Sequence, residues 1–424
     1  MDYMREEKKL HVIATESKLW HPSSQRFAEI WTALLAQMLF VEYQFTSRRV
    51  EWWSGGANAC RRTANSLNAP RQDRLSPGCR TASNEMSETY KAIEVRGPGE
   101  FAEVRRPLQD PGHDQVRIRV EACGVCHSDA ATVEGSFPGI TYPRVPGHEV
   151  VGRIDGVGSG VRGWQVGQRV GVGFLAGSCG YCEFCRGGDL VNCQNQENTG
   201  IHHDGGYAEV LLAKASSLMS IPDDLSSVDA APLLCAGLTT FGALRNAPAK
   251  AGDLVAIFGI GGLGHLAVQY ARHMGFEVAA IARGADKAEL AKKLGAHHFI
   301  DSAATDAGAA LQKLGGAKVI LITASGGKTV AETFKGLRPE GISIVLGVGP
   351  EPIETSSTDL IFGNRKLRGA LTGDPATGDA TLRFSVLSGA AAMIEMVPLG
   401  QAPAAYAKMM SGEARFRMVL TMER

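Results

Sequence analysis

The pattern of hydrophobic and polar residues along the chain changes at about residue 236. Before it, apolar and polar residues alternate, as in TYKAIEV (residues 89–95) and VRIRVEACGV (residues 116–125), and turn residues separate the short runs. Such alternation is typical of antiparallel strands, and many short strands separated by turns predict a closed all-β architecture. We therefore expect residues 86–236 to form an irregular β-barrel.

From residue 237 to about residue 370, apolar strands and amphipathic helices follow one another. This order predicts an α/β fold, a doubly wound parallel sheet with helices on both faces. We expect residues 371–424 to return to the barrel domain. The predicted strands are residues 254–260, 276–283, 318–323 and 342–348, and the predicted helices are residues 262–274, 286–296 and 331–337.

The first 85 residues show no sustained strand-like alternation and no helical periodicity. They hold four of the five tryptophans, and residues 47–83 are rich in Arg, Ser and Asn, so we expect a poorly structured N-terminal extension. Our hypothesis is that Met86 is the true translation start; mass spectrometry of the native N-terminus tests it, because a peptide from before Met86 would contradict it. An organellar transit segment is the alternative, but acidic residues such as Glu29 and Glu51 weigh against it.

Composition narrows the set of partners. The chain has 44 Lys and Arg against 44 Asp and Glu, so no net charge attracts nucleic acid or an anionic membrane. The apolar run from Trp31 to Val41 is shorter than the roughly 20 residues of a membrane span and begins too late for a secretory signal. We expect a cytoplasmic protein whose nine cysteines are metal ligands rather than disulfides.

Three glycines, Gly259, Gly261 and Gly264, form GIGGLG between an apolar strand and an amphipathic helix. Such a motif alone could be a tight turn without a ligand, but its place between strand and helix favours a dinucleotide site. The glycines allow the turn, the approach of a pyrophosphate and the close packing of helix on strand, while the first helix amides face the phosphates. Gly262 and Leu263 belong to the same predicted site.

The residues that choose between NAD and NADP are expected at the end of the next strand. The sequence there is Ala282, Arg283, Gly284. No carboxylate stands among these three to bind a ribose 2′-hydroxyl, whereas the guanidinium of Arg283 suits a 2′-phosphate, so we favour NADP(H). In the alternative, Arg283 faces solvent and the protein uses NAD.

Four cysteines, Cys179, Cys182, Cys185 and Cys193, have the spacing CxxCxxCx7C. Four thiolates at this spacing can enclose Zn²⁺ tetrahedrally with no open position, which indicates a structural zinc. An iron–sulfur cluster usually has a proline after its last cysteine, and a nucleic-acid zinc ribbon has a basic surface. The sequence has neither feature.

A catalytic zinc needs three protein ligands and one open position. The candidates are Cys126 in GVCHSD, His148 in GHEVVG and Cys235 in LLCAGLTT, although each alone could be a buried structural residue. These strings, the four-cysteine loop and GIGGLG occur in an order and at separations that resemble the medium-chain zinc-dependent alcohol dehydrogenases. The resemblance runs from Met86 to Arg424 and is greatest to the microbial primary-alcohol and cinnamyl-type enzymes.

This resemblance implies a GroES-like barrel joined to a Rossmann domain, with Cys126, His148 and Cys235 as ligands of the catalytic zinc. Glu149 resembles a carboxylate that approaches the metal transiently during ligand exchange. Asp129 resembles a residue that orients His148 through its far ring nitrogen. The fold and metal chemistry are thus expectations that the structure can test.

The resemblance also implies a proton path and coenzyme contacts. Ser128 matches a hydroxyl that relays the substrate proton toward the nicotinamide ribose. Many members carry a histidine five residues after the first zinc cysteine, where this chain has Ala131, so the proton must leave through water or another group. His127 and Arg417 resemble pyrophosphate contacts, Thr239 resembles the residue that packs on the nicotinamide ring, and Lys287 resembles a cation near the adenosine ribose. Arg283, at the strand end, and Val348 are the other predicted coenzyme contacts.

The implied activity is hydride transfer between a primary alcohol, aromatic ones included, and NAD(P), with zinc stabilising the alkoxide as a Lewis acid. Two zinc ions per chain are expected, together with a homodimer or homotetramer, since residues 367–373 resemble the family's dimer edge. The alternatives are a zinc-binding medium-chain reductase of a polyol or enone substrate and a non-catalytic member of the fold.

Overall fold

The structure is a computed structural model that describes residues 88–422. The extension predicted for residues 1–85 lies outside the described residues. Within them, no single helix is long and apolar enough to cross a membrane, and one bent helix pair, Ser227–Leu234 with α6 (Ala236–Arg245), passes that test by length and composition.

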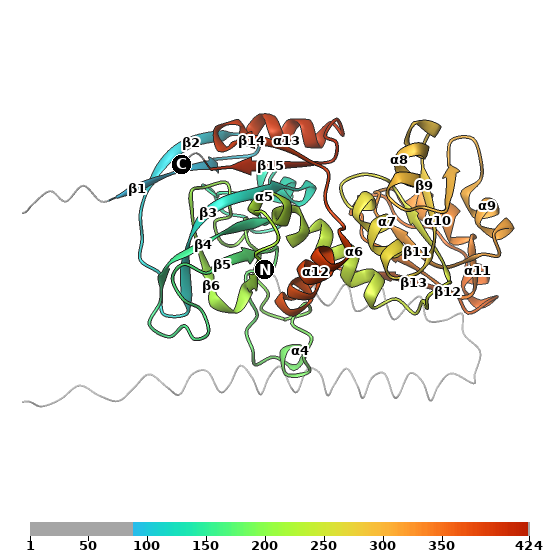
Figure 1. Cartoon of the computed structure of the whole chain (residues 1–424), viewed down its shortest axis with the longest axis horizontal. Helices are drawn as coiled ribbons and strands as arrows, with labels where there is room; N and C mark the ends of the chain where they lie inside the picture. Colours follow the sequence, from blue (N-terminus) through green and yellow to red (C-terminus); the bar gives the residue numbers. More distant parts are fainter. Residues whose placement is uncertain (1–87, 423–424) are drawn as a thin grey trace, which may run out of the picture. The chain divides into compact units, whose positions relative to one another are not determined.

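The barrel domain contains a seven-stranded sheet and a two-stranded hairpin around one hydrophobic cluster (Figure 1). Strand β3 shows why this segment folds as it does, because Val116, Ile118 and Val120 are buried while Arg117 and Arg119 alternate with them on the other face. The sheet has the order β14-β15-β3-β4-β5-β7, β6 also pairs with β3, and β1 pairs with β2. The bounds are β1 (Thr89–Val95), β2 (Phe101–Pro107), β3 (Gln115–Val125), β4 (Val150–Val157), β5 (Arg169–Val172), β6 (Val210–Lys214), β7 (Leu218–Ser220), β14 (Ile394–Pro398) and β15 (Arg417–Thr421).

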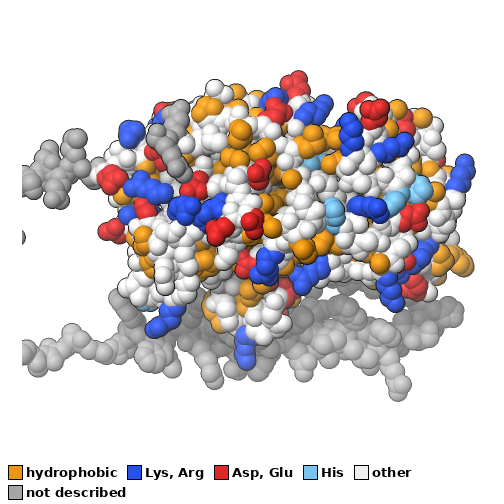
Figure 2. Space-filling view, viewed as in Figure 1, with side chains coloured by type: hydrophobic (Ala, Val, Ile, Leu, Met, Phe, Trp, Pro, Cys, Tyr) orange, Lys and Arg blue, Asp and Glu red, His pale blue; other side chains and the backbone are white. Residues whose placement is uncertain are grey.

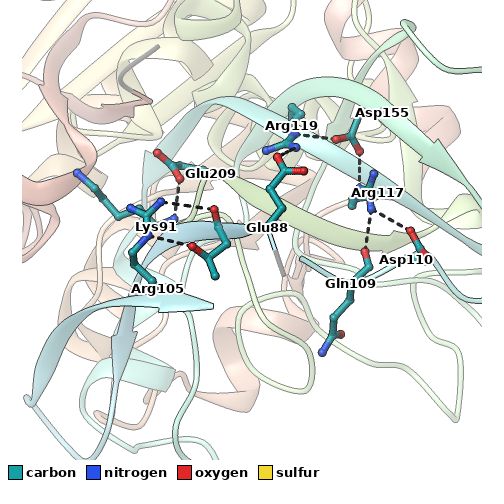
Figure 3. A network of polar contacts seen from close by, with 10 residues as sticks. Glu88, Lys91, Arg105, Gln109, Asp110, Arg117, Arg119, Asp155 and Glu209 are labelled. Carbon is teal, nitrogen blue, oxygen red and sulfur yellow. Dashed lines mark hydrogen bonds and ion pairs between the residues drawn. The ribbon is translucent and has the colours of Figure 1, made fainter. Parts of the chain in front are cut away.

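On the other face of β3, two arginines share one carboxylate of β4 (Figure 3). Arg117 Nε and Arg119 Nε each donate a hydrogen bond of 2.7 Å to Asp155, one to each carboxylate oxygen. Arg117 also lies 3.2 Å from the exposed carboxylate of Asp110. Since residues i and i+2 of a strand share a face, Asp155 can hold both arginines at once and fix β3 against β4.

Replacing Asp155 with asparagine is expected to lower the free energy of unfolding by about 1–2 kcal/mol, because the amide keeps one acceptor oxygen, so one hydrogen bond is lost and the other is no longer to a carboxylate. Urea denaturation measures the change. Asp110→Asn is the matched control, since Asp110 contacts the same arginine but its side chain is 98% exposed. Equal stabilities for the two variants would contradict the prediction.

The second half of the chain forms the doubly wound parallel sheet that the sequence predicts. Its order is β10-β9-β8-β11-β12-β13, and every neighbouring pair is parallel. The strand order reverses direction between β8 and β11, the position at which such sheets bind ligands beyond the carboxyl ends of their strands. The strands are β8 (Leu254–Phe258), β9 (Glu277–Ala282), β10 (His298–Asp301), β11 (Ala317–Ile322), β12 (Leu337–Val345) and β13 (Lys366–Gly369).

Some element boundaries differ from the prediction. The helix expected at residues 331–337 is α10 (Gly327–Phe334), and Leu337 already belongs to β12. Leu337 is fully buried and pairs with Ala317, so sheet pairing outweighs the helical pattern of AETFKGL. The helix expected from residue 262 begins two residues later, as α7 (Gly264–His273), because the glycine loop precedes it. The other helices of this half are α8 (Ala288–Lys293), α9 (Ala307–Lys313) and α11 (Ser357–Ile361).

After β13 the chain returns to the barrel sheet. Helix α12 (Pro375–Ser388) packs on α6 and α7, where Phe384 contacts Phe241 and Tyr270. Helix α13 (Ala402–Met410) connects strands β14 and β15, which pair in parallel. Strand β15 also pairs with β3 (Figure 1). Figure 2 shows Lys and Arg interspersed with Asp and Glu over the face in view, without a large patch of one sign. The short helices are α3 (Ala130–Val133), α4 (Glu183–Arg186) and α5 (Ser227–Ala230).

Candidate active site

Strand pairing brings the three candidate catalytic ligands together. Cys126 follows β3 directly and His148 lies just before β4, and the antiparallel register, Cys123 opposite Val150, places these two strand ends side by side. Cys235 is the residue before α6. The ligand atoms of all three, together with a carboxylate oxygen of Glu149, lie within 4.8 Å of one another.

His148 is oriented as a metal ligand requires. Its Nδ1 donates to Asp129 Oδ1 at 2.9 Å, which leaves Nε2 with a lone pair. That Nε2 is buried and has no hydrogen-bond partner among residues 88–422. A buried imidazole acceptor beside two sulfurs 3.7 Å apart, Cys126 Sγ and Cys235 Sγ, fits a zinc ion, which accepts this donor set.

Asp129 is itself held by two further donors. Its Oδ2 accepts hydrogen bonds of 2.9 Å from the Cys126 backbone amide and from the Tyr207 hydroxyl. Tyr207 is fully buried, and a side chain on Gly147 would come within 2.5 Å of its ring. Sequence reasoning missed Tyr207, because no local signal connects it with a carboxylate 78 residues away.

Glu149 forms a buried ion pair with Arg417, whose Nη2 donates to Glu149 Oε1. Antiparallel pairing of β15 with β3, with Met418 opposite Val125, places Arg417 beside the candidate metal ligands. Burial opposes the charge of Arg417, but Glu149 and the two nearby cysteines outweigh it and raise the pKa of the guanidinium. Arg417 therefore remains a cation next to the ligand cluster.

The ligand cluster also favours a thiolate. A hydrogen bond from Cys235 is the largest cause that lowers the pKa of Cys126; burial opposes it, and the charge of Arg417 lowers this pKa further. A thiolate, not a thiol, is the form that binds a metal. Phe174 closes one side of the cluster, with its ring edge-on to His148 at a centroid distance of 5.2 Å.

The other residues expected near the reaction surround this cluster. His127 and Ser128 form a short 3₁₀ turn after Cys126, and both side chains are exposed. Thr239 is buried in the first turns of α6, where its amide donates to the Cys235 carbonyl at 2.8 Å. Ala131, at the position where many members of the family carry a histidine, lies in α3. The structure therefore places an accessible hydroxyl, Ser128, two residues from the candidate ligand Cys126.

The glycine loop has the geometry of a phosphate-binding turn. Gly259 has a φ of +93°, which disfavours any residue with a side chain. A Cβ on Gly264 would lie 1.6 Å from the Gly259 carbonyl oxygen, whereas a Cβ on Gly261 would meet nothing within 4 Å. The loop therefore packs closely at Gly264 and is open at Gly261, where a bound pyrophosphate can come close to the protein backbone. Gly262 and Leu263 complete the turn, and Arg417 Nη1 lies 3.0 Å from a Cβ built on Gly262.

Three residues predicted to contact the coenzyme outside the glycine loop lie after β9 and β12. Arg283 is exposed directly after β9, next to Ala282. Lys287 Nζ donates to the Ile260 carbonyl of the glycine loop at 3.1 Å. Val348 follows β12 and is 86% exposed. Two cations therefore lie near the end of β9, and one of them already contacts the loop.

The four-cysteine loop forms a second ligand cluster around α4. The Sγ atoms of Cys179, Cys182, Cys185 and Cys193 all lie within 4.8 Å of one another. Backbone amides point at the sulfurs, for example Cys182 N at 3.4 Å from Cys179 Sγ and Cys185 N at 3.5 Å from Cys182 Sγ. The Cys185 amide is the largest cause that lowers the pKa of Cys182. Four thiols with amide donors fit a closed tetrahedral zinc site.

Comparison with known proteins identifies the family of the chain. The alcohol dehydrogenase GroES-like domain family matches residues 112–223, and the zinc-binding dehydrogenase family matches residues 262–386. Alcohol dehydrogenase notN of Aspergillus sp. (strain MF297-2) is 40% identical over 339 residues, 80% of this chain and 99% of that protein. The chain belongs to the medium-chain zinc-dependent alcohol dehydrogenases.

Solved structures of this alcohol dehydrogenase family have the same fold. CAD from Helicobacter pylori, complexed with NADP(H), has a TM-score of 0.70 and 28% identity, covering 78% of this chain and 98% of that one. An NAD-dependent alcohol dehydrogenase has a TM-score of 0.73 and 25% identity, covering 78% and 100%. As an alcohol dehydrogenase, the chain transfers hydride between a small alcohol or aldehyde and NAD(P), with zinc.

Proposed function

We propose that this alcohol dehydrogenase holds a catalytic zinc at Cys126, His148 and Cys235 and a structural zinc at the four-cysteine cluster, and that it interconverts primary alcohols and aldehydes with NADP(H). The observation that carries the proposal is the buried His148 Nε2, which has no partner among the described residues and lies with two sulfurs and a carboxylate oxygen within 4.8 Å. An unpaired buried acceptor costs free energy unless a cation or donor satisfies it.

A bound zinc ion supplies a Lewis acid that lowers the pKa of the alcohol hydroxyl. The chain's own residues then orient the imidazole of His148 and relay the substrate proton. Asp129, fixed by Tyr207 and by the Cys126 amide, holds the imidazole of His148 in one tautomer. The exposed Ser128 hydroxyl accepts the substrate proton and passes it to water, because Ala131 offers no acid or base.

Glu149 and Arg417 are proposed to set the charge around the ligand cluster. Two thiolates and a carboxylate together would neutralise the zinc charge and weaken its pull on a substrate oxygen. Arg417 binds one oxygen of Glu149, and the other oxygen has no partner within residues 88–422. The arginine therefore offsets the negative charge while leaving one carboxylate oxygen available to the cluster.

Aromatic primary alcohols are included among the proposed substrates because Phe174 borders the cluster. Its ring lies edge-on to His148 and is only partly buried, so an aromatic substrate could contact it in an offset or edge-on arrangement. A screen of primary, secondary and aromatic alcohols, followed by absorbance of the reduced nicotinamide, tests this proposal. A zinc-loaded enzyme that oxidises only secondary alcohols would contradict it.

The preference for NADP(H) rests on the end of β9. Ala282 stands where a carboxylate would bind a ribose 2′-hydroxyl, and Arg283 is exposed beside it. A guanidinium can form two hydrogen bonds with a 2′-phosphate. The CAD from Helicobacter pylori, a structural neighbour, is complexed with NADP(H).

Arg283→Ala is expected to lower kcat/KM for NADP about tenfold to a hundredfold, because a charge-assisted hydrogen bond contributes about 1.5–3 kcal/mol. The value for NAD should change little, since NAD has no 2′-phosphate. Steady-state kinetics with each coenzyme measure both. Lys293→Ala, which removes an exposed cation from the end of α8, is the control and should leave the ratio unchanged; a wild-type preference for NAD would overturn the proposal.

A further inference from the structure

His265 is a buried histidine that the proposed mechanism does not use. It is the second residue of α7, and its side chain is fully buried. Its Nδ1 lies 2.8 Å from the Gly261 carbonyl oxygen, and its Nε2 accepts a hydrogen bond of 3.1 Å from the Met393 amide. Since Nε2 must be an acceptor, the proton lies on Nδ1, and the imidazole donates to the glycine loop.

The bond to Gly261 fixes the direction of one peptide group in the loop. The Gly261 carbonyl accepts from His265 Nδ1 and from the His265 amide, at 2.8 and 3.1 Å. In a planar trans peptide the C=O and N–H point in opposite directions, so the Gly262 amide is turned away from the helix. Within residues 88–422, the amides of Gly261 and Gly262 have no hydrogen-bond acceptor. They are donors aimed where a pyrophosphate would lie.

The second bond of His265 connects the glycine loop to the segment that carries Arg417. The Met393 amide binds His265, and the Met393 carbonyl accepts hydrogen bonds of 3.0 Å from the amides of Phe416 and Arg417. The ring of Phe416 also packs against the imidazole at a centroid distance of 5.1 Å. A continuous chain of hydrogen bonds thus runs from the loop through His265 and Met393 to the arginine paired with Glu149.

The surroundings keep this imidazole neutral. Burial is the largest cause that lowers the pKa of His265, to about 4, and the charge of Arg417 lowers it as well. A protonated ring would present a second N–H to the Met393 amide, which is itself a donor. Throughout the neutral pH range, therefore, Nδ1 stays the donor to the Gly261 carbonyl and Nε2 stays the acceptor from the Met393 amide.

We propose that His265 is a positioning residue that orients the Gly261–Gly262 peptide for the coenzyme pyrophosphate and ties that loop to the segment holding Arg417. The inference rests on the proposed function in one respect, that the glycine loop binds the dinucleotide. The two ring nitrogens have separate tasks. Nδ1 sets the affinity for coenzyme, and Nε2 anchors residue 393 and contributes to stability.

Two amide variants separate these tasks. In His265→Asn the side-chain nitrogen can take the place of Nδ1, whereas in His265→Gln the side-chain oxygen can take the place of Nε2. The experiment titrates the zinc-loaded full-length enzyme with NADPH and with NADH, without alcohol, and measures Kd by nicotinamide fluorescence. Thermal unfolding of each variant is followed in parallel, together with its zinc content.

The Asn variant is expected to keep Kd within about threefold of the wild type but to unfold at a lower temperature. The Gln variant is expected to raise Kd about tenfold, the effect of one lost hydrogen bond at the loop, and to unfold closer to the wild type. Zinc content should not change in either. Equal coenzyme affinity in the Gln variant and the wild type, or rescue by Gln rather than Asn, would overturn the inference.

Tyr270→Phe is the matched control on the same helix. It removes a buried hydrogen bond of 2.8 Å between the Tyr270 hydroxyl and Ser385 Oγ, away from the glycine loop, so the melting temperature should fall while Kd stays unchanged. A Kd that rises in this variant too would show that affinity follows general stability, and would also overturn the inference. Failure of the wild type to bind either dinucleotide would instead contradict the proposed function.

Discussion

Cys126→Ala is expected to reduce the bound zinc from two ions per chain to one and to lower kcat by about a thousandfold or more, because a metal Lewis acid stabilises the transition state by several kcal/mol. Cys126 is one of the three proposed ligands, and its Sγ lies 3.7 Å from that of a second, Cys235. The remaining sulfur and imidazole bind zinc more weakly than the complete set. Elemental analysis of the purified protein and steady-state turnover measure the two effects.

A neighbouring thiol provides the control for this substitution. Cys123 lies three residues earlier, is fully buried, and belongs to neither ligand cluster. Cys123→Ala should therefore keep both zinc ions and most of the turnover, at a small cost in stability from the space left by the sulfur. Retained turnover in Cys126→Ala, with two zinc ions still bound, would show that the catalytic metal is held elsewhere.

Cys182→Ala is expected to have the largest effect on stability, with loss of the second zinc ion and an apparent melting temperature lower by about 10 °C or more, because the free energy of a structural metal contributes directly to folding. The loop has little else to hold it. Its buried cluster, within the described residues, consists of Cys182, Cys185 and Cys193, with Cys179 and Leu190 packed against them. Differential scanning calorimetry and zinc analysis measure the result.

The same loop offers a matched control. Tyr181 is adjacent to Cys182 in sequence but its side chain is 70% exposed, so Tyr181→Ala should keep both zinc ions and the wild-type melting temperature. Turnover of the Cys182 variant below its melting temperature should be retained in part, since the catalytic cluster is separate. An unchanged melting temperature after loss of the second zinc would contradict a structural role for this ion.

The fold class, the four-cysteine cluster and the glycine loop could be predicted because their signals are local or periodic. Cys126, His148 and Cys235 lie far apart in the sequence, and only the resemblance to a family connected them. Alternation with a period of two marks β3, and the strand–helix order marks the parallel sheet. The four cysteines of the loop lie within a segment of fifteen residues, and the three glycines of the dinucleotide motif lie in a single turn. Spacing along a short segment already restricts which atoms can meet, so no knowledge of the tertiary structure is needed.

Element boundaries were less predictable where propensity and pairing disagree. The pattern AETFKGL indicates a helix to residue 337, but the last of these residues, Leu337, begins a parallel strand opposite Ala317. A parallel pairing depends on a partner strand that is separated in sequence, and its free energy does not show in the local pattern. The extension of residues 1–85 stays a prediction, since it lies outside the described residues.

The sequence by itself determined which residues of this alcohol dehydrogenase can bind zinc and which loop can bind a dinucleotide. Only the tertiary structure decided their partners: Tyr207 on Asp129, Arg417 on Glu149 and Met393 on His265. These contacts join residues 78, 268 and 128 positions apart. For Arg417 and Glu149 the physical reason is strand register, because a slip of one residue in the pairing of β3 with β4 or β15 would turn one side chain to the opposite face. The other two contacts join a loop or turn with a residue from a distant part of the chain, so they exist only in the folded chain.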